Sequence, residues 1–442
     1  MRASHDLSRV SVNFTETNLI PNAGLLPAAM LAQRIDLAGL VDQRLQLARH
    51  GAGSGSKALT VIGSVLAGGD SIDDTAVLRA GAAGILFDDT RAPSTIGSWL
   101  RAHKWSHVRQ HDAICRELLA RLWAAGAGPA DLTAPLMFDL DSSIVPVFGR
   151  GKQGAAFGYT KVRGYHPQFA TCAQTGMVLF SRLRGGAAGS ARGAKSFLTE
   201  TVSRLRNAGA TGELTVRADS AFFSKAVLHT AVKLNVRFSV TIRQDKKIRA
   251  AIDAIDESAW QPIPYWLSTP ETSGADVAET SYTAFSGKDA MTVRLIVRRV
   301  RPTPGSQLAL FTTWDYHAFV TNRDGEFLEI EADHRRHAIV EQRIAELKSA
   351  GLAHLPSGKF MANAVWLALS VMAHNLGKAV GRLAGPDLDS ATAATLRRKV
   401  FTVPGRLVSS ARRLALRLPE SWPWATAIEQ AIEKIQAIPL RC

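Results

Sequence analysis

Acidic residues near the ends of apolar segments are the most chemically informative feature of this sequence. Asp139 and Asp141 lie within "LMFDLDSSIVPVFG" (136–149), whose apolar and β-branched residues predict a buried strand. Asp219 follows the apolar segment "LTVRA", and Glu341 lies in "ADHRRHAIVEQRIAELKSAG" (332–351), a basic segment whose middle is predicted as a helix. Alternation along a strand places Asp139 and Asp141 on the same face.

Carboxylates placed in this way can bind divalent metal ions. An aspartate is unfavourable in a strand, and a buried one must be paired, hydrogen-bonded or bound to a metal. Two acids at strand ends and one on a helix can form an all-oxygen site for Mg²⁺ or Mn²⁺. Two such ions, about 4 Å apart, can act on the attacking and leaving oxygens of a phosphate. Two simpler readings stay open: strand-end aspartates often cap turns, and a glutamate among arginines often lies on a solvated face.

Basic residues surround Glu341, and the whole chain is basic. The formal net charge of +15 and the isoelectric point of about 10.1 indicate a polyanionic partner, with nucleic acid favoured over an anionic membrane surface. Helical spacing predicts one polar stripe, made of His334, His337, Glu341 and Lys348. Cations near the acid could hold a phosphate backbone while the acid holds metal. These cations are Arg335, Arg336, Arg343 and Lys348.

Several protein classes are disfavoured by the composition. The three cysteines, Cys115, Cys172 and Cys442, are far apart and form no CxxC pair, so we expect neither a disulfide framework nor a zinc site. The N-terminal residues lack the apolar core of a signal peptide. The longest apolar run, residues 361–376, is too short to span a bilayer and predicts a buried helix. We therefore expect a cytoplasmic protein with no membrane partner.

The pattern divides the chain into five segments. Residues 1–134 are predicted to be mostly helical, and they could form either a module that binds DNA ends or a packing domain that never touches DNA. Residues 135–245 predict three strands, a helix, a strand, a helix and a strand, which is a mixed α/β sheet. We expect a β-rich insertion at 246–315, a last core strand and the Glu341 helix at 316–380, and a basic helical region at 381–442.

The segments that carry the acids resemble a known family. They are similar to the DDE transposases of bacterial insertion sequences, and most similar to the group 1 type. The resemblance implies an α/β fold with a ribonuclease-H-like mixed sheet flanked by helices, a β-rich insertion before the catalytic glutamate helix, and a helical N-terminal domain. It is carried by "DLDSSIVPVFGRGKQGAAFGYTKVRGYHPQFA", "VRADSAFFSKAVLHTA" and "HRRHAIVEQRIAELK".

The resemblance also implies a catalytic triad. The family's first aspartate, which precedes a small hydroxyl residue, matches Asp141, with Asp139 as the competitor. The second aspartate matches Asp219, and the glutamate matches Glu341. Together these three would hold two Mg²⁺ or Mn²⁺ ions. Related transposases carry Tyr, Arg, Glu and Lys along the glutamate helix, whereas this chain has His334, His337, Glu341 and Lys348.

The implied function is DNA transposition. Such a protein binds the terminal inverted repeats of its element, cleaves there, and joins the freed 3′-OH to target DNA, as a homodimer in the bacterial nucleoid. The rival interpretations are a ribonuclease-H-like nuclease without strand transfer and a catalytically inactive, domesticated DNA-binding protein. Predicted DNA contacts are Lys348, Arg343, His337 and His334, together with Lys161, Arg163, Tyr165 and His166, for which a turn with ordinary surface charge is the alternative.

Overall fold

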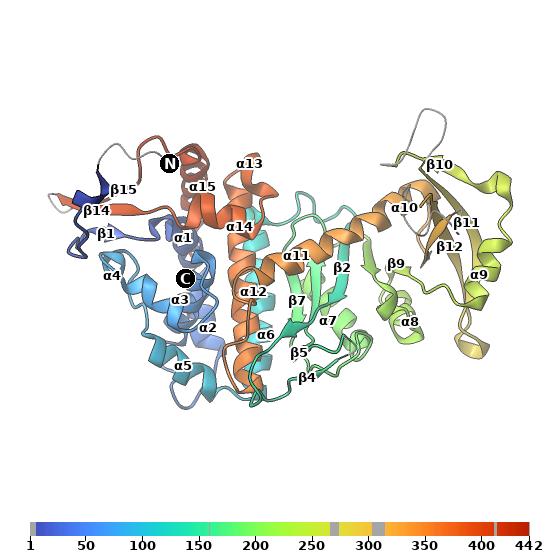
Figure 1. Ribbon diagram of the computed structural model, residues 1–442, viewed down its shortest axis with the longest axis horizontal. Helices are drawn as coiled ribbons and strands as arrows, with labels where there is room; N and C mark the ends of the chain where they lie inside the picture. Colours follow the sequence, from blue (N-terminus) through green and yellow to red (C-terminus); the bar gives the residue numbers. More distant parts are fainter. Residues whose placement is uncertain (1–5, 159, 266–273, 303–313, 411–412, 442) are drawn as a thin grey trace.

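A nine-stranded mixed sheet forms the backbone of the computed structural model (Figure 1). The structure describes residues 6–158, 160–265, 274–302, 314–410 and 413–441. The strand order across the sheet is β10-β11-β12-β13-β9-β8-β2-β6-β7. A helical half packs against one end of this sheet, and the other end extends away from it.

The five strands at the β7 end of the sheet make the ribonuclease-H-like core. Its first three strands are antiparallel neighbours, and Gly176, with φ of 66°, allows the tight turn between the second and third. Strand β8 then pairs parallel to β2, and β9 pairs parallel to β8. The predicted order is found for the strands of this sheet and their helices, and three short strands that were not predicted intervene between the first and second of them. The elements are β2 (Leu136–Ser142), β6 (Gln168–Cys172), β7 (Val178–Arg182), α7 (Ala194–Asn207), β8 (Leu214–Ala218), α8 (Lys225–Lys233) and β9 (Val236–Thr241).

The residues predicted as a β-rich insertion, and the strand predicted to follow it as the last core strand, extend the same sheet. Strand β13 pairs antiparallel with β9, and the hairpin of β11 and β12 follows. Their inner faces enclose a small core that includes Val277, Ile296 and Phe319 and is closed by Ile330. The elements are α9 (Lys246–Asp253), β10 (Gln261–Ile263), β11 (Ala275–Ala284), β12 (Met291–Val300) and β13 (Asp315–Thr321).

The segment that carries Glu341 is two helices rather than one. Helix α10 (Phe327–Arg335) and helix α11 (Ile339–Lys348) are joined by a 3-10 turn at Arg336–Ala338. Buried contacts of α10 with the extended strands and of α11 with the core explain the break, because each half packs on a different part of the sheet. Glu341 therefore lies in the first turn of α11.

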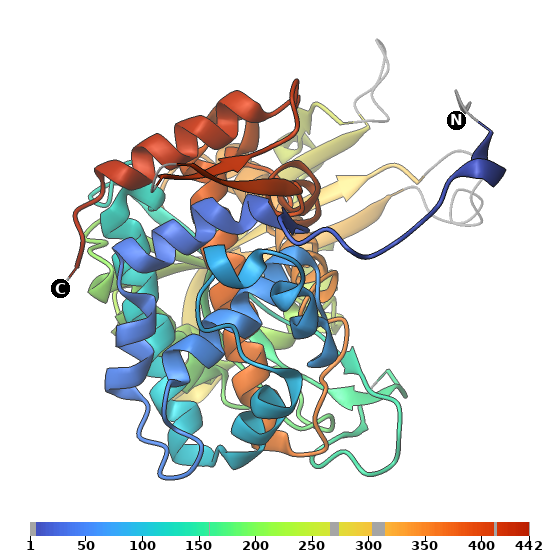
Figure 2. The same ribbon diagram turned by 90° about the vertical axis from the view of Figure 1, so that its left-hand side faces the viewer.

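The helical half is organised around α12 (Phe360–Leu383), which contains the apolar run predicted as a buried helix. This helix is buried along almost its whole length and stands between the sheet and the N-terminal helices (Figures 1 and 2). It packs against β7 on one side and against α3 and α6 on the other. The surrounding helices are α1 (Leu26–Arg34), α2 (Leu37–Arg44), α3 (Ser54–Ala67), α4 (Ala83–Leu86), α5 (Pro93–Ala102), α6 (Trp105–Leu122), α13 (Pro386–Asp389), α14 (Ala393–Leu396) and α15 (Ala425–Ala437).

The C-terminal region differs from the helical prediction. Strands β14 (Gly405–Ser410) and β15 (Arg413–Arg417) form a hairpin that pairs with β1 (Leu19–Ile20) near the other end of the chain. Leu407 and Leu416 face each other across the hairpin and pack with Ile20. The strand partner is almost 400 residues away in sequence, so local composition alone did not reveal it.

Two smaller features complete the description. A three-stranded sheet of β3 (Val145–Pro146), β5 (Arg163–Tyr165) and β4 (Ala156–Phe157) follows β2.

Within the described ranges no single helix is long and apolar enough to cross a membrane. Only the bent pair Ala23–Arg34 and Leu37–Arg44 passes that test when its two helices are taken together.

Candidate active site

Two of the predicted catalytic acids lie side by side at the end of the core sheet. The parallel register of β2 and β8 pairs Leu140 with Ala218, so the next residues along the two strands are Asp141 and Asp219. Neighbouring strands lie about 4.8 Å apart, and residues in register point to the same face. The two carboxylates therefore project together from the carboxyl ends of two adjacent strands.

Asp139 lies one pleat earlier on the same face and is fully engaged by basic groups. The Arg217 guanidinium donates two hydrogen bonds to its carboxylate, of 2.7 and 2.8 Å, and His337 Nδ1 lies 2.8 Å from Oδ1. Asp139 is 2% exposed. A buried carboxylate with a bidentate arginine is a structural ion pair, and its oxygens are not available to a metal. This arrangement favours Asp141 over Asp139 as the first catalytic aspartate.

Asp141 and Asp219, unlike Asp139, lie where burial disfavours their negative charge. The pKa of Asp141 is raised to about 6, chiefly by burial and also by the negative charges of Asp219 and Glu341, while a hydrogen bond from the Ser142 backbone N–H and the nearby His337 oppose the shift. Burial likewise raises the pKa of Asp219, although the Ala221 N–H donates to its Oδ1 at 3.0 Å. The protein therefore holds two carboxylates where their negative charges are disfavoured.

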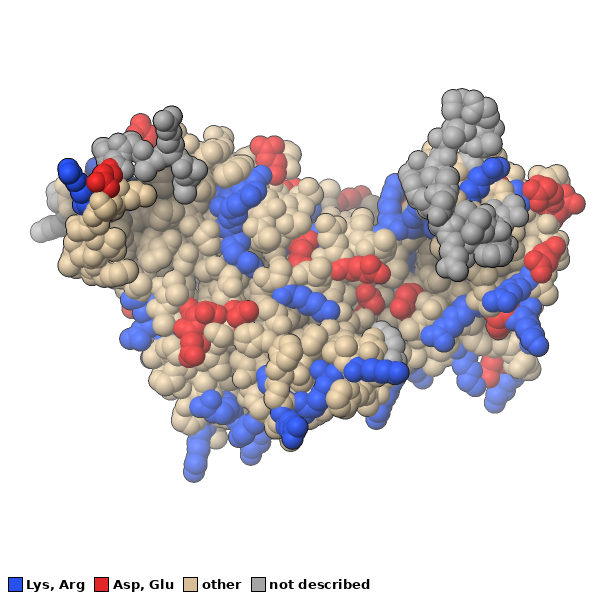
Figure 3. Space-filling view, viewed as in Figure 1, with Lys and Arg blue, Asp and Glu red and all other residues tan. Residues whose placement is uncertain are grey.

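Glu341 approaches this pair from the first turn of α11. The helix packs against β2, and its negative charge acts on Asp141. Among the described residues, no lysine, arginine or histidine nitrogen lies within 4.0 Å of the carboxylate oxygens of Asp141, Asp219 or Glu341. Three neighbouring acids that lack a basic partner within the described ranges are unexpected in a chain of net charge +15. In the view of Figure 3, acidic side chains lie near the middle of the molecular surface and basic ones lie along its lower edge.

The three carboxylates are of the right chemical type to bind a divalent cation, although their side chains do not converge on one point. Across the described part of the chain, no three His, Cys, Asp or Glu side chains converge closely enough to hold a metal ion. The three acids offer oxygen ligands of the kind that Mg²⁺ and Mn²⁺ prefer. A cation would also relieve the burial and repulsion that raise the pKa of Asp141. On this chemical ground the residues fit the expected metal.

Lys348 lies beside the acids, at the last turn of α11. Its ammonium donates a hydrogen bond of 2.5 Å to the Ser143 hydroxyl. Burial lowers the pKa of Lys348, while the charge of Asp141 opposes that shift. The lysine is thus the basic group that accompanies the acids without pairing with them. Arg343 lies one turn earlier, where it donates to Glu346 at 2.9 Å and packs over Gly176.

His334 and His337, which the resemblance aligns with a Tyr and an Arg, join the segment of Glu341 to the sheet. The ring of His334 stacks on Phe319, with centroids 3.9 Å apart, and its nitrogens lie 2.8 and 3.0 Å from the hydroxyls of Ser239 and Thr241. Burial lowers the pKa of His334 well below its usual range. His337 bonds to Asp139 as described above. In this structure both side chains contact other residues of the protein. Their predicted contacts with DNA stay predictions.

The segment "KVRGYHP" is placed partly inside the protein. Tyr165 is buried, and its hydroxyl donates to the Gln153 carbonyl and accepts from Asn363. His166 is also buried, with Nδ1 2.5 Å from the Ala188 carbonyl. Arg163 donates to the carbonyls of Gly149 and Arg150, and Lys161 is exposed. Lys161 and Arg163 are therefore the members of this set that reach the surface.

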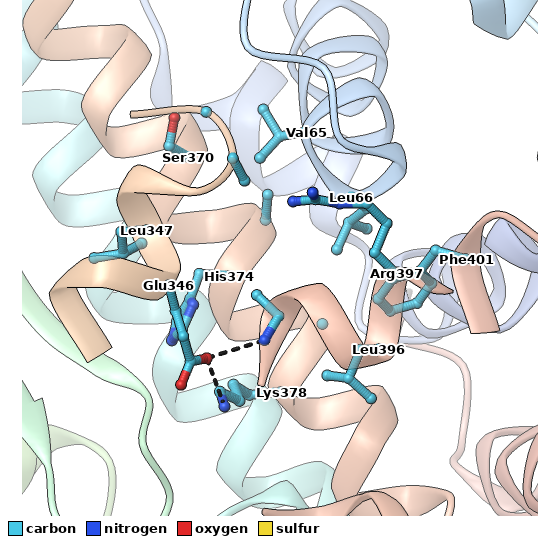
Figure 4. A pocket seen from close by; sticks show the side chains of 15 residues that line it. Val65, Leu66, Glu346, Leu347, Ser370, His374, Lys378, Leu396, Arg397 and Phe401 are labelled. Carbon is cyan, nitrogen blue, oxygen red and sulfur yellow. Dashed lines mark hydrogen bonds and ion pairs between the residues drawn. The ribbon is translucent and has the colours of Figure 1, made fainter. Parts of the chain in front are cut away.

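Sequence reasoning missed a polar anchor behind α11. The Glu346 carboxylate lies 2.9 Å from the Lys378 ammonium on α12 and accepts from the Ala393 N–H of α14 at 3.1 Å (Figure 4). Burial would raise the pKa of Glu346, but the Lys378 charge holds it below its usual value. The anchor fixes the helix of Glu341 to the helical half. It joins residues 32 positions apart on separate helices, which no local pattern predicts.

Arg217 was also missed as a functional neighbour, although a signal for it was present. It lies two residues before Asp219 and is the register partner of Asp139, so alternation predicts that the two share a face. An arginine in an apolar strand needs a buried anion. Asp139 was the available one, and this pairing could have separated Asp139 from Asp141.

Comparison with known proteins identifies the family of this chain. The family model described as transposase DDE domain group 1 matches residues 3–440. No curated protein sequence matches the chain. Among solved structures, the cryo-EM structure of the piggyBac transposase synaptic complex with hairpin DNA is 11% identical, with 88% of this chain and 80% of that chain covered at a TM-score of 0.42, too low to support an argument. Because the family model spans nearly the whole chain, the protein belongs to the transposases with a group 1 DDE domain.

Proposed function

We propose that this transposase serves a bacterial insertion sequence, cleaving DNA at the terminal inverted repeats and joining the freed 3′-OH to target DNA. One observation carries the proposal. Asp141, Asp219 and Glu341 are neighbouring acids with no basic partner among the described residues, whereas Asp139, one pleat away, is fully paired. Unpaired carboxylates at strand ends, in a strongly basic protein, are suited to a cation and a polyanion together.

The three acids would hold Mg²⁺ or Mn²⁺, and two ions would fit the expected reaction. When bound, such ions activate the attacking oxygen and stabilise the leaving oxygen at the phosphorus. In cleavage, a water oxygen bonds to phosphorus and the bond to the 3′ oxygen breaks, which leaves a 3′-OH. In joining, that 3′-OH attacks a target phosphate and the target's own 3′ oxygen leaves. The number of bonds to phosphorus is unchanged, so no other reactant is needed.

The chain's own residues would bind and orient the DNA. Lys348, with its ammonium beside Asp141, is placed to contact the phosphate that reacts. Arg343, Lys161 and Arg163 would contact phosphates further along the backbone. His334 and His337 would act chiefly by holding α10 and α11 to the sheet. Two copies would bring two ends together, and residues 1–134 would contribute to recognition of the ends.

Cleavage of a duplex that carries the flanking inverted repeat tests the proposal. Wild type is compared with Glu341→Gln, in Mg²⁺ and in EDTA, and both DNA binding and product formation are measured. Glu329→Gln is the matched control, because it makes the same change at an exposed glutamate on α10. We expect Mg²⁺-dependent cleavage at the repeat boundary by wild type and by the control. Glu341→Gln should bind DNA without cleaving it.

Two other outcomes decide between the rival functions. Cleavage without any joined product, when target DNA is supplied, would indicate a nuclease rather than a transposase. Binding without cleavage by the wild-type protein would indicate a catalytically inactive DNA-binding protein. Equal cleavage by wild type and Glu341→Gln would remove Glu341 from the active site.

A further inference from the structure

Exposed apolar side chains gather at one end of the molecule, far from the acids. Of the fifteen large hydrophobic side chains that are exposed among the described residues, eight belong to residues 7–19, to residues 77–85 or to β15. These segments adjoin, because the β1–β14–β15 sheet and α4 share a small core (Figure 1). The eight are Leu7, Val10, Val12, Phe14, Leu19, Val77, Ile85 and Leu414. Concentrated exposed apolar surface marks an interaction site.

The segment that precedes β1, residues 6–18, begins with a 3-10 turn at Leu7–Arg9 and continues with the pattern of a strand that belongs to no sheet. We call it the N-terminal arm. Val10, Val12 and Phe14 alternate with Ser11 and Asn13, and they are 56%, 80% and 101% exposed. Period-two alternation is typical of a strand with one buried face. Figure 2 shows the arm extending away from the body of the protein. The alternating pattern predicts that one face of the arm is buried against another surface. In this structure that face is exposed.

The β14–β15 hairpin presents a matching surface. Strand β15 is the last strand of its sheet and has one neighbour, β14, in the described part of the chain. Leu414 pairs with Ser409 on the same face as Leu416 and Leu407, but lies beyond their core and is 53% exposed. An edge strand with unpaired backbone groups accepts an added strand, and pockets for alternate side chains fix its register.

Charge does not oppose the same pairing. The arm carries Asp6, Arg9 and Glu16, a net charge of −1. The hairpin strands carry Arg406, Arg413 and Arg417 without an acid. Arg406 already forms an ion pair with Glu16, 2.7 Å long, where the arm meets β1. Both acids of the arm are thus paired within one copy, Asp6 with Arg9 and Glu16 with Arg406, so the apolar pattern and the open strand edge carry the match between the two surfaces.

We propose that the N-terminal arm of one copy pairs with the β15 edge of a second copy of this chain. Each copy offers both a strand and an edge, so a two-fold axis satisfies both at once and closes the assembly. The copy's own arm enters the sheet at β1, which lies at the opposite edge from β15. We therefore assign the β15 edge to the arm of a second copy. The inference does not depend on the metal site or on the proposed reaction.

Cysteine cross-linking between different variants of the full chain tests this exchange. In a Cys442→Ser background, proteins with Val10→Cys, Val12→Cys or Phe14→Cys are mixed one at a time with Leu414→Cys and oxidised. All four positions are largely exposed, so the substitutions leave the fold intact. We expect a disulfide between the two different chains for at least one arm position. Its yield should exceed that of the control by roughly tenfold, because docked thiols have a high effective concentration.

The matched control replaces Leu414→Cys with Val232→Cys, a residue of similar exposure, 50%, on α8. Cross-linking no greater than this control at all three arm positions would overturn the proposal. A chain carrying both Phe14→Cys and Leu414→Cys that links only within itself would also overturn it, because the arm would then lie on its own sheet. As a separate readout, Val12→Asp with Phe14→Asp should convert the dimer to monomer by light scattering.

Discussion

Arg217 holds Asp139 across the parallel strands β2 and β8, and the next register position brings Asp141 beside Asp219. One strand pair thus carries a neutralised acid and, a single pleat further on, two acids that have no basic partner among the residues the structure describes. The first pair stabilises the sheet, and the second is available to a cation. This division between neighbouring residues makes several quantitative predictions.

Asp139→Asn and Asp141→Asn should have opposite effects. Asp139→Asn leaves the Arg217 charge buried, and breaking such a pair lowers the free energy of unfolding by about 3–5 kcal/mol. Asp141→Asn should abolish cleavage without lowering stability, because the carboxylate it removes is disfavoured by burial. Urea unfolding and the cleavage assay measure the two effects. A loss of stability for Asp141→Asn as large as that for Asp139→Asn would contradict the assignment.

Stability of the metal-free protein should depend on pH through Asp141. Its pKa rises from 3.8 to about 6 on folding, so its contribution to stability is complete below pH 3.8 and is lost as the pH rises through about 6. Asp141→Asn removes this dependence. The variant should be more stable than wild type at neutral pH and similar to it near pH 4, as measured by urea unfolding in EDTA.

The affinity for metal should also depend on the ionisation of Asp141, but it should increase as the pH rises. A cation binds the ionised form, so affinity for Mn²⁺ should fall by about tenfold per pH unit below the pKa of Asp141, about 6. Calorimetry between about pH 5 and about pH 7.5 would measure this. Glu329→Gln should keep the full dependence. Affinity that stays constant over this interval would remove Asp141 from the metal site.

Lys348→Met should weaken DNA binding and slow cleavage. If the ammonium contacts one phosphate, its loss should reduce the slope of log affinity against log salt by about one unit. Lys348→Arg should keep the slope, because it keeps the charge. Lys288→Met, at the exposed tip between β11 and β12, is the control for a lysine far from the acids. An unchanged slope for Lys348→Met would argue that Lys348 has only its hydrogen bond to Ser143.

Lys378→Met should affect the active site from a distance. It leaves Glu346 buried without its ammonium partner, and we expect a loss of about 3–5 kcal/mol in unfolding free energy. Lys378→Met combined with Glu346→Gln should recover only part of that loss, since it removes the buried carboxylate that lacks its ammonium but also breaks the ion pair of Glu346 with Arg343. Because Glu346 anchors α11, metal affinity should fall in the single variant and recover with stability in the double variant. Independent changes in the two quantities would separate the anchor from Glu341.

The core strands and their acids could be predicted because local rules determine them. Alternation and β-branched residues identify β2 and β8, and the position of Asp141 before Ser142 distinguishes it from Asp139 by resemblance. Three features depended on distant contacts. The β14–β15 hairpin needs β1, the break before α11 follows from separate packing of two helices, and Glu346 needs Lys378.

Burial was the hardest property to predict for polar residues. Tyr165 and His166 lie in a stretch that reads as a basic turn, yet both side chains are enclosed by the loops around them. Their partners are the carbonyls of Gln153 and Ala188 and the amide of Asn363, groups that every chain has in abundance. Such contacts leave no signature in composition or spacing. Charge alone therefore overestimates which residues can reach DNA.

The position of α12 limits how this transposase can move. The helix supplies core residues to the N-terminal helices and to β7 at once, so neither half retains a complete interior without it. The two halves should therefore melt in one cooperative transition, and fragments that end before residue 360 should be insoluble. DNA bound to the N-terminal helices would be held rigidly against the catalytic strands. Any bending needed to bring the strand into place must then come from the DNA itself.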